Sequence, residues 1–137
     1  MIAKTGTGKS FKGLTAYLQD EMKNGFVLDS DGVRITTPQA MAFDFHQQAK
    51  NNERTIKSVG HDSLSFALND RKLSDEEMKT IARAYMDKMG YQETQYVIVR
   101  HQDRPHQHCH IVYNRVNNEG NTITDKFNYL RANRICR

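Results

Sequence analysis

The stretch TQYVIVRHQDRPHQHCHIVYNR, residues 94–115, decides the fold of this chain. Apolar and β-branched residues fill both of its ends, which predicts one strand over residues 94–101 and another over residues 107–115. The connection between them is short and contains Pro105. Since short connections join antiparallel neighbours, we expect the two strands to lie side by side in one sheet.

Further helices and strands are predicted on both sides of this hairpin. Apolar residues at helical spacing predict helices over residues 11–23 and 38–50, and a third helix between a capping box at Ser74 and Glu77 and a glycine at position 90. The other patterns are a strand over residues 57–68, a hairpin of residues 26–28 and 33–35 around a turn at 29–32, a turn at 117–120, and an amphipathic segment from Lys126 onward. This order predicts an α+β fold in which helices cover a central antiparallel sheet.

The length of 137 residues suits a single domain. We expect residues 1–137 to form that domain and, because the last predicted helix runs into residues 134–137 without a cap, to be the N-terminal part of a longer protein. Two cysteines are too few for a disulfide framework, and no apolar run has the length of a membrane span, which predicts a cytoplasmic protein with no membrane partner. The formal charge of +4 permits an anionic partner.

Four of the six histidines lie between residues 101 and 110. On a strand, His106, His108 and His110 alternate onto one face at roughly 6.6–7 Å per two-residue step, so the outer two lie roughly 13 Å apart. Because a metal–imidazole bond is only about 2.0–2.1 Å long, one ion cannot bind all three. His101 ends the neighbouring strand, and we favour His101, His108 and His110 as the ligands. The alternative set is His106 with His108 and His101.

The predicted metal site leaves coordination positions open. Three neutral imidazoles leave the ion its full charge, which favours a catalytic metal over a closed structural one. Imidazole suits Zn, Mn, Ni, Co or Cu, so the ligands do not name the ion. The expected cofactor is a divalent metal ion, Mg, Mn, Zn or Ni. Asp103 is placed to orient a ligand ring, whereas Cys109 points to the opposite face of the strand and is expected to be buried.

A segment near the N-terminus, GTGKS at residues 6–10, is similar to part of a phosphate-binding loop. The complete Walker pattern needs a glycine where this chain has Ala3, and we expect at most two or three residues of strand before the segment. Hydrolysis of nucleoside triphosphates is therefore excluded. The glycines and Lys9 remain candidates for contact with a phosphate.

Three motifs resemble, in their order along the chain, those of the relaxase (mobilisation nuclease) family of HUH endonucleases, in particular its MOB-P-like members. The first is Tyr17 on the helix predicted over residues 11–23. The second is the strand segment GHDSLSF, residues 60–66. The third is the run H-x-D-x-x-H-x-H-x-H-x-x-x-N-R, which begins at His101 and ends at Arg115.

The resemblance implies a metal-dependent nuclease that starts the transfer of plasmids and mobile elements. Tyr17 would attack a phosphodiester of single-stranded DNA at an origin of transfer, forming a 5′-phosphotyrosyl bond and releasing a 3′-hydroxyl. Asp103 and His106 are the candidates for acid–base catalysis. Some relatives carry the proline just before the penultimate histidine of the run, whereas Pro105 precedes His106, so the third ligand is either His106 or His110. Accessory mobilisation proteins and a coupling protein are the expected partners, in a bacterial cytoplasm.

Residues that contact DNA are expected around the histidine strands and near the N-terminal glycines. The predicted set comprises Lys9, His61, Arg100, Arg104, Asn114, Arg115 and Lys126. Two other enzymes compete with the relaxase. One is a rolling-circle replication initiator, whose nucleophile usually follows the histidine motif. The other is a metal-dependent phosphodiesterase that uses activated water, in which Tyr17 is merely structural.

Overall fold

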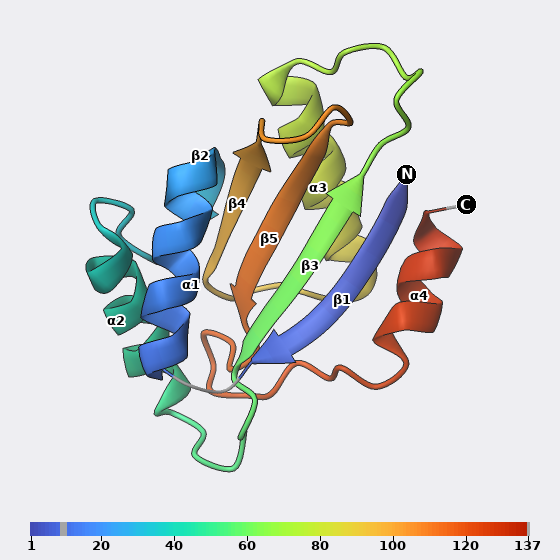
Figure 1. Ribbon diagram of the computed structural model, residues 1–137. Helices are drawn as coiled ribbons and strands as arrows, with labels where there is room; N and C mark the ends of the chain where they lie inside the picture. Colours follow the sequence, from blue (N-terminus) through green and yellow to red (C-terminus); the bar gives the residue numbers. More distant parts are fainter. Residues whose placement is uncertain (9–10, 137) are drawn as a thin grey trace.

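The computed structural model describes residues 1–8 and 11–136 (Figure 1). In chain order its elements are β1 (Ile2–Gly8), α1 (Phe11–Asn24), β2 (Gly25–Asp31), α2 (Pro38–Ala49), β3 (Val59–Ser65), α3 (Asp75–Met89), β4 (Tyr96–His101), β5 (His108–Asn114) and α4 (Asn128–Ile135). Within this part of the chain the strands form one sheet in the order β1-β3-β5-β4-β2, and all neighbours are antiparallel. The predicted α+β class is confirmed.

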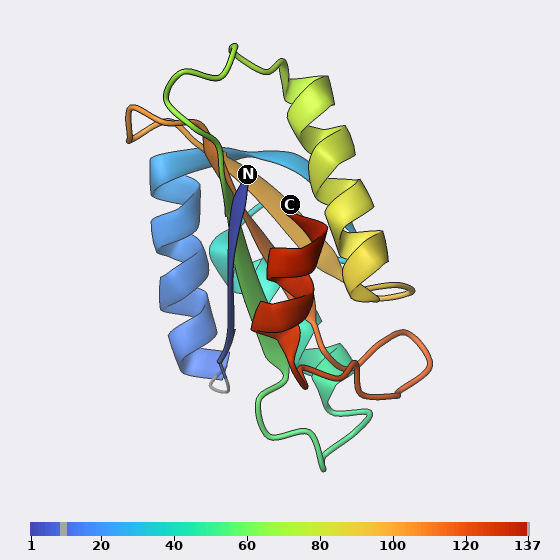
Figure 2. The ribbon, with the colours of Figure 1, turned by 90° about the vertical axis from the view of Figure 1, so that its right-hand side faces the viewer.

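Helices cover both faces of the sheet (Figure 2). Helices α1 and α2 lie on one face, where their apolar residues pack on Val97, Val99 and Val112. Helices α3 and α4 lie on the other face, where a second core includes Ile98 and Ile111. Neighbouring residues of one strand therefore serve different cores, as the period of two in a β-strand requires.

The strands β4 and β5 form the predicted hairpin, in which His101 pairs with His108. Cys109 faces the α3 and α4 side and is fully buried there. The histidines on either side of Cys109 therefore face α1 and α2. The sequence pattern was sufficient here because both strands are long, apolar and adjacent in the chain.

Local signals also position the helices. The Ser74 side chain accepts a hydrogen bond from the Glu77 backbone, and the Glu77 side chain accepts one from the Ser74 backbone, so the predicted capping box is confirmed. Gly90 ends α3 with a φ of 84°, a left-handed conformation that favours glycine. Thr37 caps α2 in front of Pro38.

The predicted hairpin within residues 26–35 is wrong. Residues 25–31 form a single strand, β2, which pairs with β4 across a bulge between Val27 and Asp29. Polar residues are tolerated in this strand because Asp29 accepts hydrogen bonds from Arg83 and Tyr96. Tertiary contacts thus override the turn propensity of this segment.

The N-terminal strand is longer than the two or three residues expected. β1 pairs with β3 along its whole length, with Gly6 opposite His61 and Gly8 opposite Val59. Lys9, a predicted DNA contact, lies outside the described residues. None of the described helices has both the length and the apolar character needed to cross a membrane.

The junction between α1 and β2 has no loop. α1 ends at Asn24 and β2 begins at Gly25, which pairs directly with His101. A side chain on Gly25 would overlap the Arg100 carbonyl oxygen, so glycine is required for this close approach. The end of α1 is thereby held next to the histidine strands.

Candidate active site

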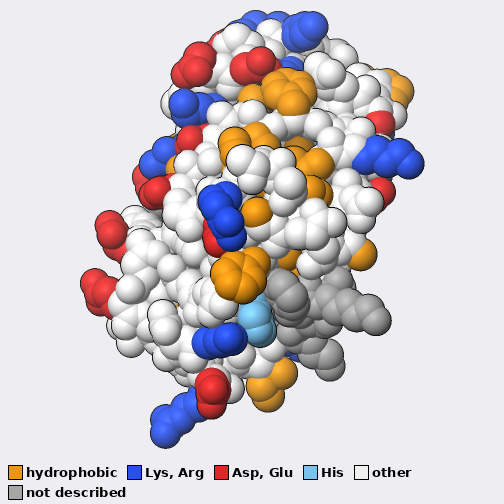
Figure 3. Space-filling view, turned by 90° about the vertical axis from the view of Figure 1, so that its left-hand side faces the viewer, with side chains coloured by type: hydrophobic (Ala, Val, Ile, Leu, Met, Phe, Trp, Pro, Cys, Tyr) orange, Lys and Arg blue, Asp and Glu red, His pale blue; other side chains and the backbone are white. Residues whose placement is uncertain are grey.

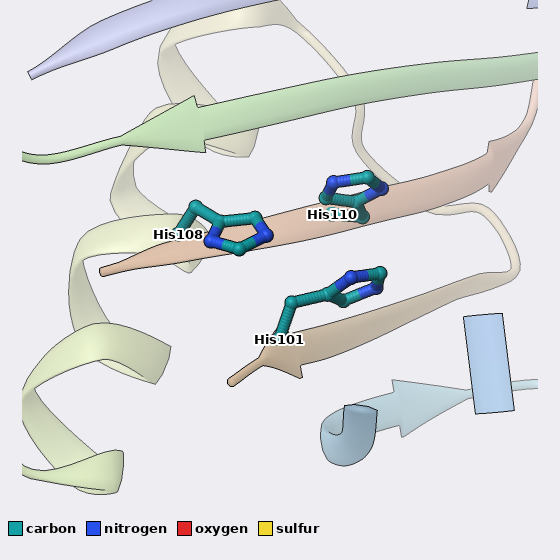
Figure 4. A group of neighbouring side chains, drawn as sticks. All are labelled: His101, His108 and His110. Carbon is teal, nitrogen blue, oxygen red and sulfur yellow. The ribbon is translucent and has the colours of Figure 1, made fainter. Parts of the chain in front are cut away.

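Three histidines meet on the face of the sheet that α1 covers (Figure 4). His101 comes from the end of β4, and His108 and His110 come from β5. One ring nitrogen of each lies within 4.8 Å of the others. The rings of His101 and His110 stack with centroids 4.1 Å apart. His106 lies outside this group, and its ring lies near the ring of His108, at 5.5 Å between centroids.

The chemistry of His108 fits a metal ligand. Its Nδ1 lies 3.2 Å from the His106 carbonyl oxygen and donates to it, which leaves Nε2 with a free lone pair. That Nε2 is buried, and none of the described residues forms a hydrogen bond with it. The Asp103 carboxylate lies 3.3 Å away, so two electron-rich groups face each other. Such a pair attracts a cation, and the burial of His108 lowers its pKa and keeps the ring neutral.

A buried carboxylate, Glu21 of α1, joins two of the three rings. It accepts a hydrogen bond from Nε2 of His101 at 2.5 Å and another from Nδ1 of His110 at 2.9 Å. Burial alone would raise the pKa of Glu21, but these hydrogen bonds outweigh it and hold the pKa well below its usual range. In return, Glu21 raises the pKa of His101. A carboxylate in this position fixes ring orientation, as partners of metal-bound histidines do.

Tyr17 lies on α1 one helical turn before Glu21. Its ring contacts the ring of His61 at 4.9 Å between centroids. His61, on β3, lies with its Nε2 3.3 Å from Nδ1 of His110, so a chain of contacts joins the phenol to the histidine cluster. The Tyr17 hydroxyl is buried and forms no hydrogen bond with the described residues. Burial and the nearby Glu21 raise the pKa of this phenol far above its usual range.

The neutral state of His61 also follows from its position. Burial, together with the neighbouring His110, lowers the pKa of His61 to about 4. The ring is therefore uncharged at neutral pH. Glu21, His61 and His110 form a second group whose ligand atoms lie within 4.8 Å of one another.

The connection between β4 and β5 carries two more of the predicted residues. The Asp103 carboxylate lies 3.7 Å from Nδ1 of His101 in addition to its approach to His108. Arg104 is exposed in the same connection, where its charge acts on His101. Both residues are accessible from outside at the open end of the histidine cluster.

Other predicted DNA contacts lie away from this cluster. Arg100 faces the opposite side of the sheet, where it is buried and pairs with Asp75 and Gln107. Its neighbours Val99 and His101 face the site, so alternation along β4 explains why closeness in sequence did not bring Arg100 to the same face. This placement favours a structural role for Arg100.

Asn114 and Arg115 are buried at the far end of β5. The Asn114 side chain donates to the Phe45 carbonyl and to Gln95. Arg115 donates to backbone carbonyls of Lys57 and Ile123. These hydrogen bonds join the end of β5 to α2 and to the segments that precede β3 and α4. Lys126 is exposed just before α4, with its ammonium over the Phe127 ring.

Glu21 is the residue that sequence reasoning missed. The available signal was a carboxylate four residues after Tyr17, hence on the same side of a helix whose neighbouring residues are apolar. An acidic side chain on a core-facing stripe needs a partner, and this partner proved to be a pair of histidines.

The fold agrees with the family comparison. The model of the family described as "Relaxase: MobA/VirD2-like, nuclease domain" matches residues 17–137, from Tyr17 to the end of the chain. The chain therefore belongs to the relaxase family, whose nuclease domain nicks single-stranded DNA in a metal-dependent reaction. Comparison with curated proteins gave no match, and comparison with solved structures gave none either.

Proposed function

We propose that this domain nicks one DNA strand at an origin of transfer by transesterification, with Tyr17 as the nucleophile. The observation that carries the proposal is the continuous contact from the Tyr17 ring through His61 to His110, within the cluster that also contains His101 and His108. A nucleophile and a candidate metal site thus lie against the same small part of the sheet.

In the proposed step the Tyr17 oxygen bonds to phosphorus, and the bond between phosphorus and the 3′ oxygen of the preceding nucleotide breaks. The products are a 5′-phosphotyrosyl end on the protein and a free 3′-hydroxyl. Since the new ester conserves the energy of the old one, the reverse attack rejoins the strand. No nucleoside triphosphate is needed.

His101, His108 and His110 would hold the divalent ion. When bound, that ion supplies charge stabilisation at a non-bridging phosphate oxygen. Glu21 keeps the His101 and His110 rings in place by its two hydrogen bonds. The Asp103 carboxylate lies 3.3 Å from Nε2 of His108, so in this proposal it lies beside the ion.

Proton transfer is assigned by contact. His61 is the ring that touches Tyr17, so we propose that it accepts the phenol proton. His106, at the opposite end of the cluster, remains the candidate that protonates the leaving 3′ oxygen. Asp103 lies near His101 and His108, so its contacts favour a role at the metal site over a proton-transfer role.

The DNA path is proposed to follow the open end of the cluster, near the exposed Arg104. On the side of the molecule where α1 and α2 lie, Lys and Arg side chains alternate with Asp and Glu around a row of hydrophobic side chains (Figure 3). The described residues on that side show no concentration of positive charge. In this proposal the reaction starts conjugative mobilisation, together with accessory mobilisation proteins and a coupling protein.

The decisive measurement is a covalent adduct. Single-stranded oligonucleotides that tile the transfer origin of the protein's own element, labelled at the 3′ end, are incubated with the protein and Mn²⁺ and separated on a denaturing gel. We expect a labelled protein band for the wild type and none for Tyr17→Phe. Tyr129→Phe, an exposed tyrosine of α4, is the matched control and should behave as the wild type.

The competing enzymes give different results in the same assay. Cleavage without an adduct, or an undiminished adduct with Tyr17→Phe, would indicate a phosphodiesterase or another nucleophile. A replication initiator would form its adduct with a replication origin and not with a transfer origin. Binding without any cleavage would indicate a DNA-binding module.

A further inference from the structure

A cavity of about 370 Å³ lies beside Tyr17 and His61. It is formed by the end of β1, the start of β3 and the first half of α1. The described residues that line it are Gly6, Thr7, Gly8, Gly13, Leu14, Tyr17, Val59 and His61. Its size lies within the roughly 300–1,000 Å³ typical of small-ligand pockets.

The glycines of β1 keep this cavity open. Gly6 and Gly8 pair with His61 and Val59, and residues directly opposite each other in a sheet point to the same face. Neither glycine has a positive φ. A Cβ on Gly8 would meet nothing within 4 Å, and one on Gly6 would make only an ordinary contact with a carbonyl oxygen.

The backbone therefore does not require glycine at these two positions. Gly60 in β3 shows the contrast, because a Cβ there would overlap the Tyr113 ring. Glycine weakens a strand, and its presence in a strand interior often marks close approach of a ligand. We therefore attribute glycine at positions 6 and 8 to the open space that it leaves in the cavity.

The walls of the cavity favour a flat aromatic ligand. Leu14 and Val59 supply apolar surface, and the Tyr17 and His61 rings supply faces for stacking. The described lining residues include no Lys, Arg, Asp or Glu. A nucleobase matches this lining, and stacking of a base on an aromatic side chain is worth about 1–3 kcal/mol.

We propose that this cavity binds one nucleobase of the single-stranded DNA, next to the phosphate that Tyr17 attacks. The inference rests on the proposed function, because it takes Tyr17 as the residue shared by the base pocket and the reaction centre. In this arrangement the phosphate lies toward the histidines and the base toward β1. The cavity then sets which bases are accepted beside the nicked bond.

The test compares a base with the same backbone lacking it. ¹⁵N-labelled protein in EDTA is titrated with the tetranucleotide d(TTTT) and with an abasic tetranucleotide of equal charge, and amide shifts are followed by NMR. We expect d(TTTT) to shift the amides of Gly6, Gly8 and Gly13, and the abasic chain to leave them unchanged. Equal shifts with both probes, or no shift at these glycines with d(TTTT), would overturn the proposal.

Variants locate the effect in the cavity. Gly8→Val fills the space with a residue that suits a strand, and we expect it to weaken d(TTTT) binding by about tenfold or more. Gly8→Ala should give a smaller loss. Thr5→Val lies on β1 outside the lining and is the control that should bind as the wild type. Unchanged binding by Gly8→Val with an intact amide spectrum contradicts the proposal.

The NMR titration and the adduct assay test the base pocket and the nuclease reaction independently of each other. EDTA removes divalent metal, so the titration measures binding without chemistry. Base-dependent shifts with no adduct would refute transesterification by Tyr17 and leave the pocket in place. An adduct from Tyr17 without base-dependent shifts would support the nuclease and refute the base pocket.

Discussion

Glu21 is the residue through which one helix organises the site. A single buried carboxylate accepts hydrogen bonds from His101 on β4 and from His110 on β5. Both rings carry two nitrogens, and a hydrogen bond to one of them decides which nitrogen is left for a metal. The orientation of two proposed ligands therefore depends on a residue of another element.

Replacing this carboxylate tests its role. We expect Glu21→Gln to weaken Mn²⁺ binding by about 10–100-fold, because an amide cannot accept both hydrogen bonds as an ionised carboxylate does. The measurement is calorimetric titration of the purified protein, with circular dichroism as a check of folding. Asp20→Asn, the exposed neighbouring acid, is the control for charge. An unchanged affinity for Glu21→Gln would remove the positioning role.

At the scale of elements, α1 and the β4–β5 hairpin together make the site. α1 aligns Leu14, Tyr17 and Glu21 along one side, so that the cavity, the phenol and the histidines follow one another along the helix. The hairpin places His101 beside His108 through its register. Neither element contains a complete site by itself.

Helix α3 covers the other face and depends on its cap. We expect Ser74→Ala to lower the free energy of unfolding by about 1 kcal/mol, because the Glu77 backbone N–H loses its acceptor. Urea unfolding monitored by circular dichroism measures this change. Thr80→Ala, an exposed position within the same helix, should be neutral or slightly stabilising. A loss at Thr80 equal to that at Ser74 would argue against the capping explanation.

The sequence alone predicted the structure correctly where the pattern involves residues that are close together in the chain. Period-two alternation over residues 94–115 predicted which histidines share a face, and the Ser74 and Glu77 spacing predicted the start of α3. The pairing of β1 with β3 was not predictable in this way, because the glycines, Ala3 and Lys4 of β1 are weak strand formers and its partner is distant in sequence. Glu21 was missed because its partners depend on how α1 packs on the sheet.

At the scale of the whole molecule, the sheet separates two polar clusters. The histidines lie on one face, and Asp62, the residue after His61, is fully buried on the other. The Asp62 carboxylate accepts hydrogen bonds from the hydroxyls of Tyr85 and Tyr91 at 2.7 and 2.8 Å. Burial outweighs these hydrogen bonds and raises the pKa of Asp62 to about 6.

This buried acid predicts a pH dependence of global stability. The folded state binds the Asp62 proton more tightly than the unfolded chain, whose pKa is near 3.9, so the contribution is full below about pH 4 and is lost as pH rises through about 6. Relative to Asp62→Asn, we expect the wild type to lose about 2 kcal/mol between pH 4 and pH 7. Urea unfolding of both proteins at the two pH values measures the difference. A constant difference would show that Asp62 titrates normally.

The loop-free junction between α1 and β2 has a consequence for how this chain tolerates changes in length. Gly25 is fixed opposite His101, and Tyr17 and Glu21 lie a few residues before it on a continuous helix. One residue inserted between Glu21 and Gly25 would rotate both side chains about the helix axis by about 100° and carry them away from the histidines. Insertions and deletions at this junction are therefore incompatible with the site, whereas the connection between α2 and β3 offers exposed positions where length can vary.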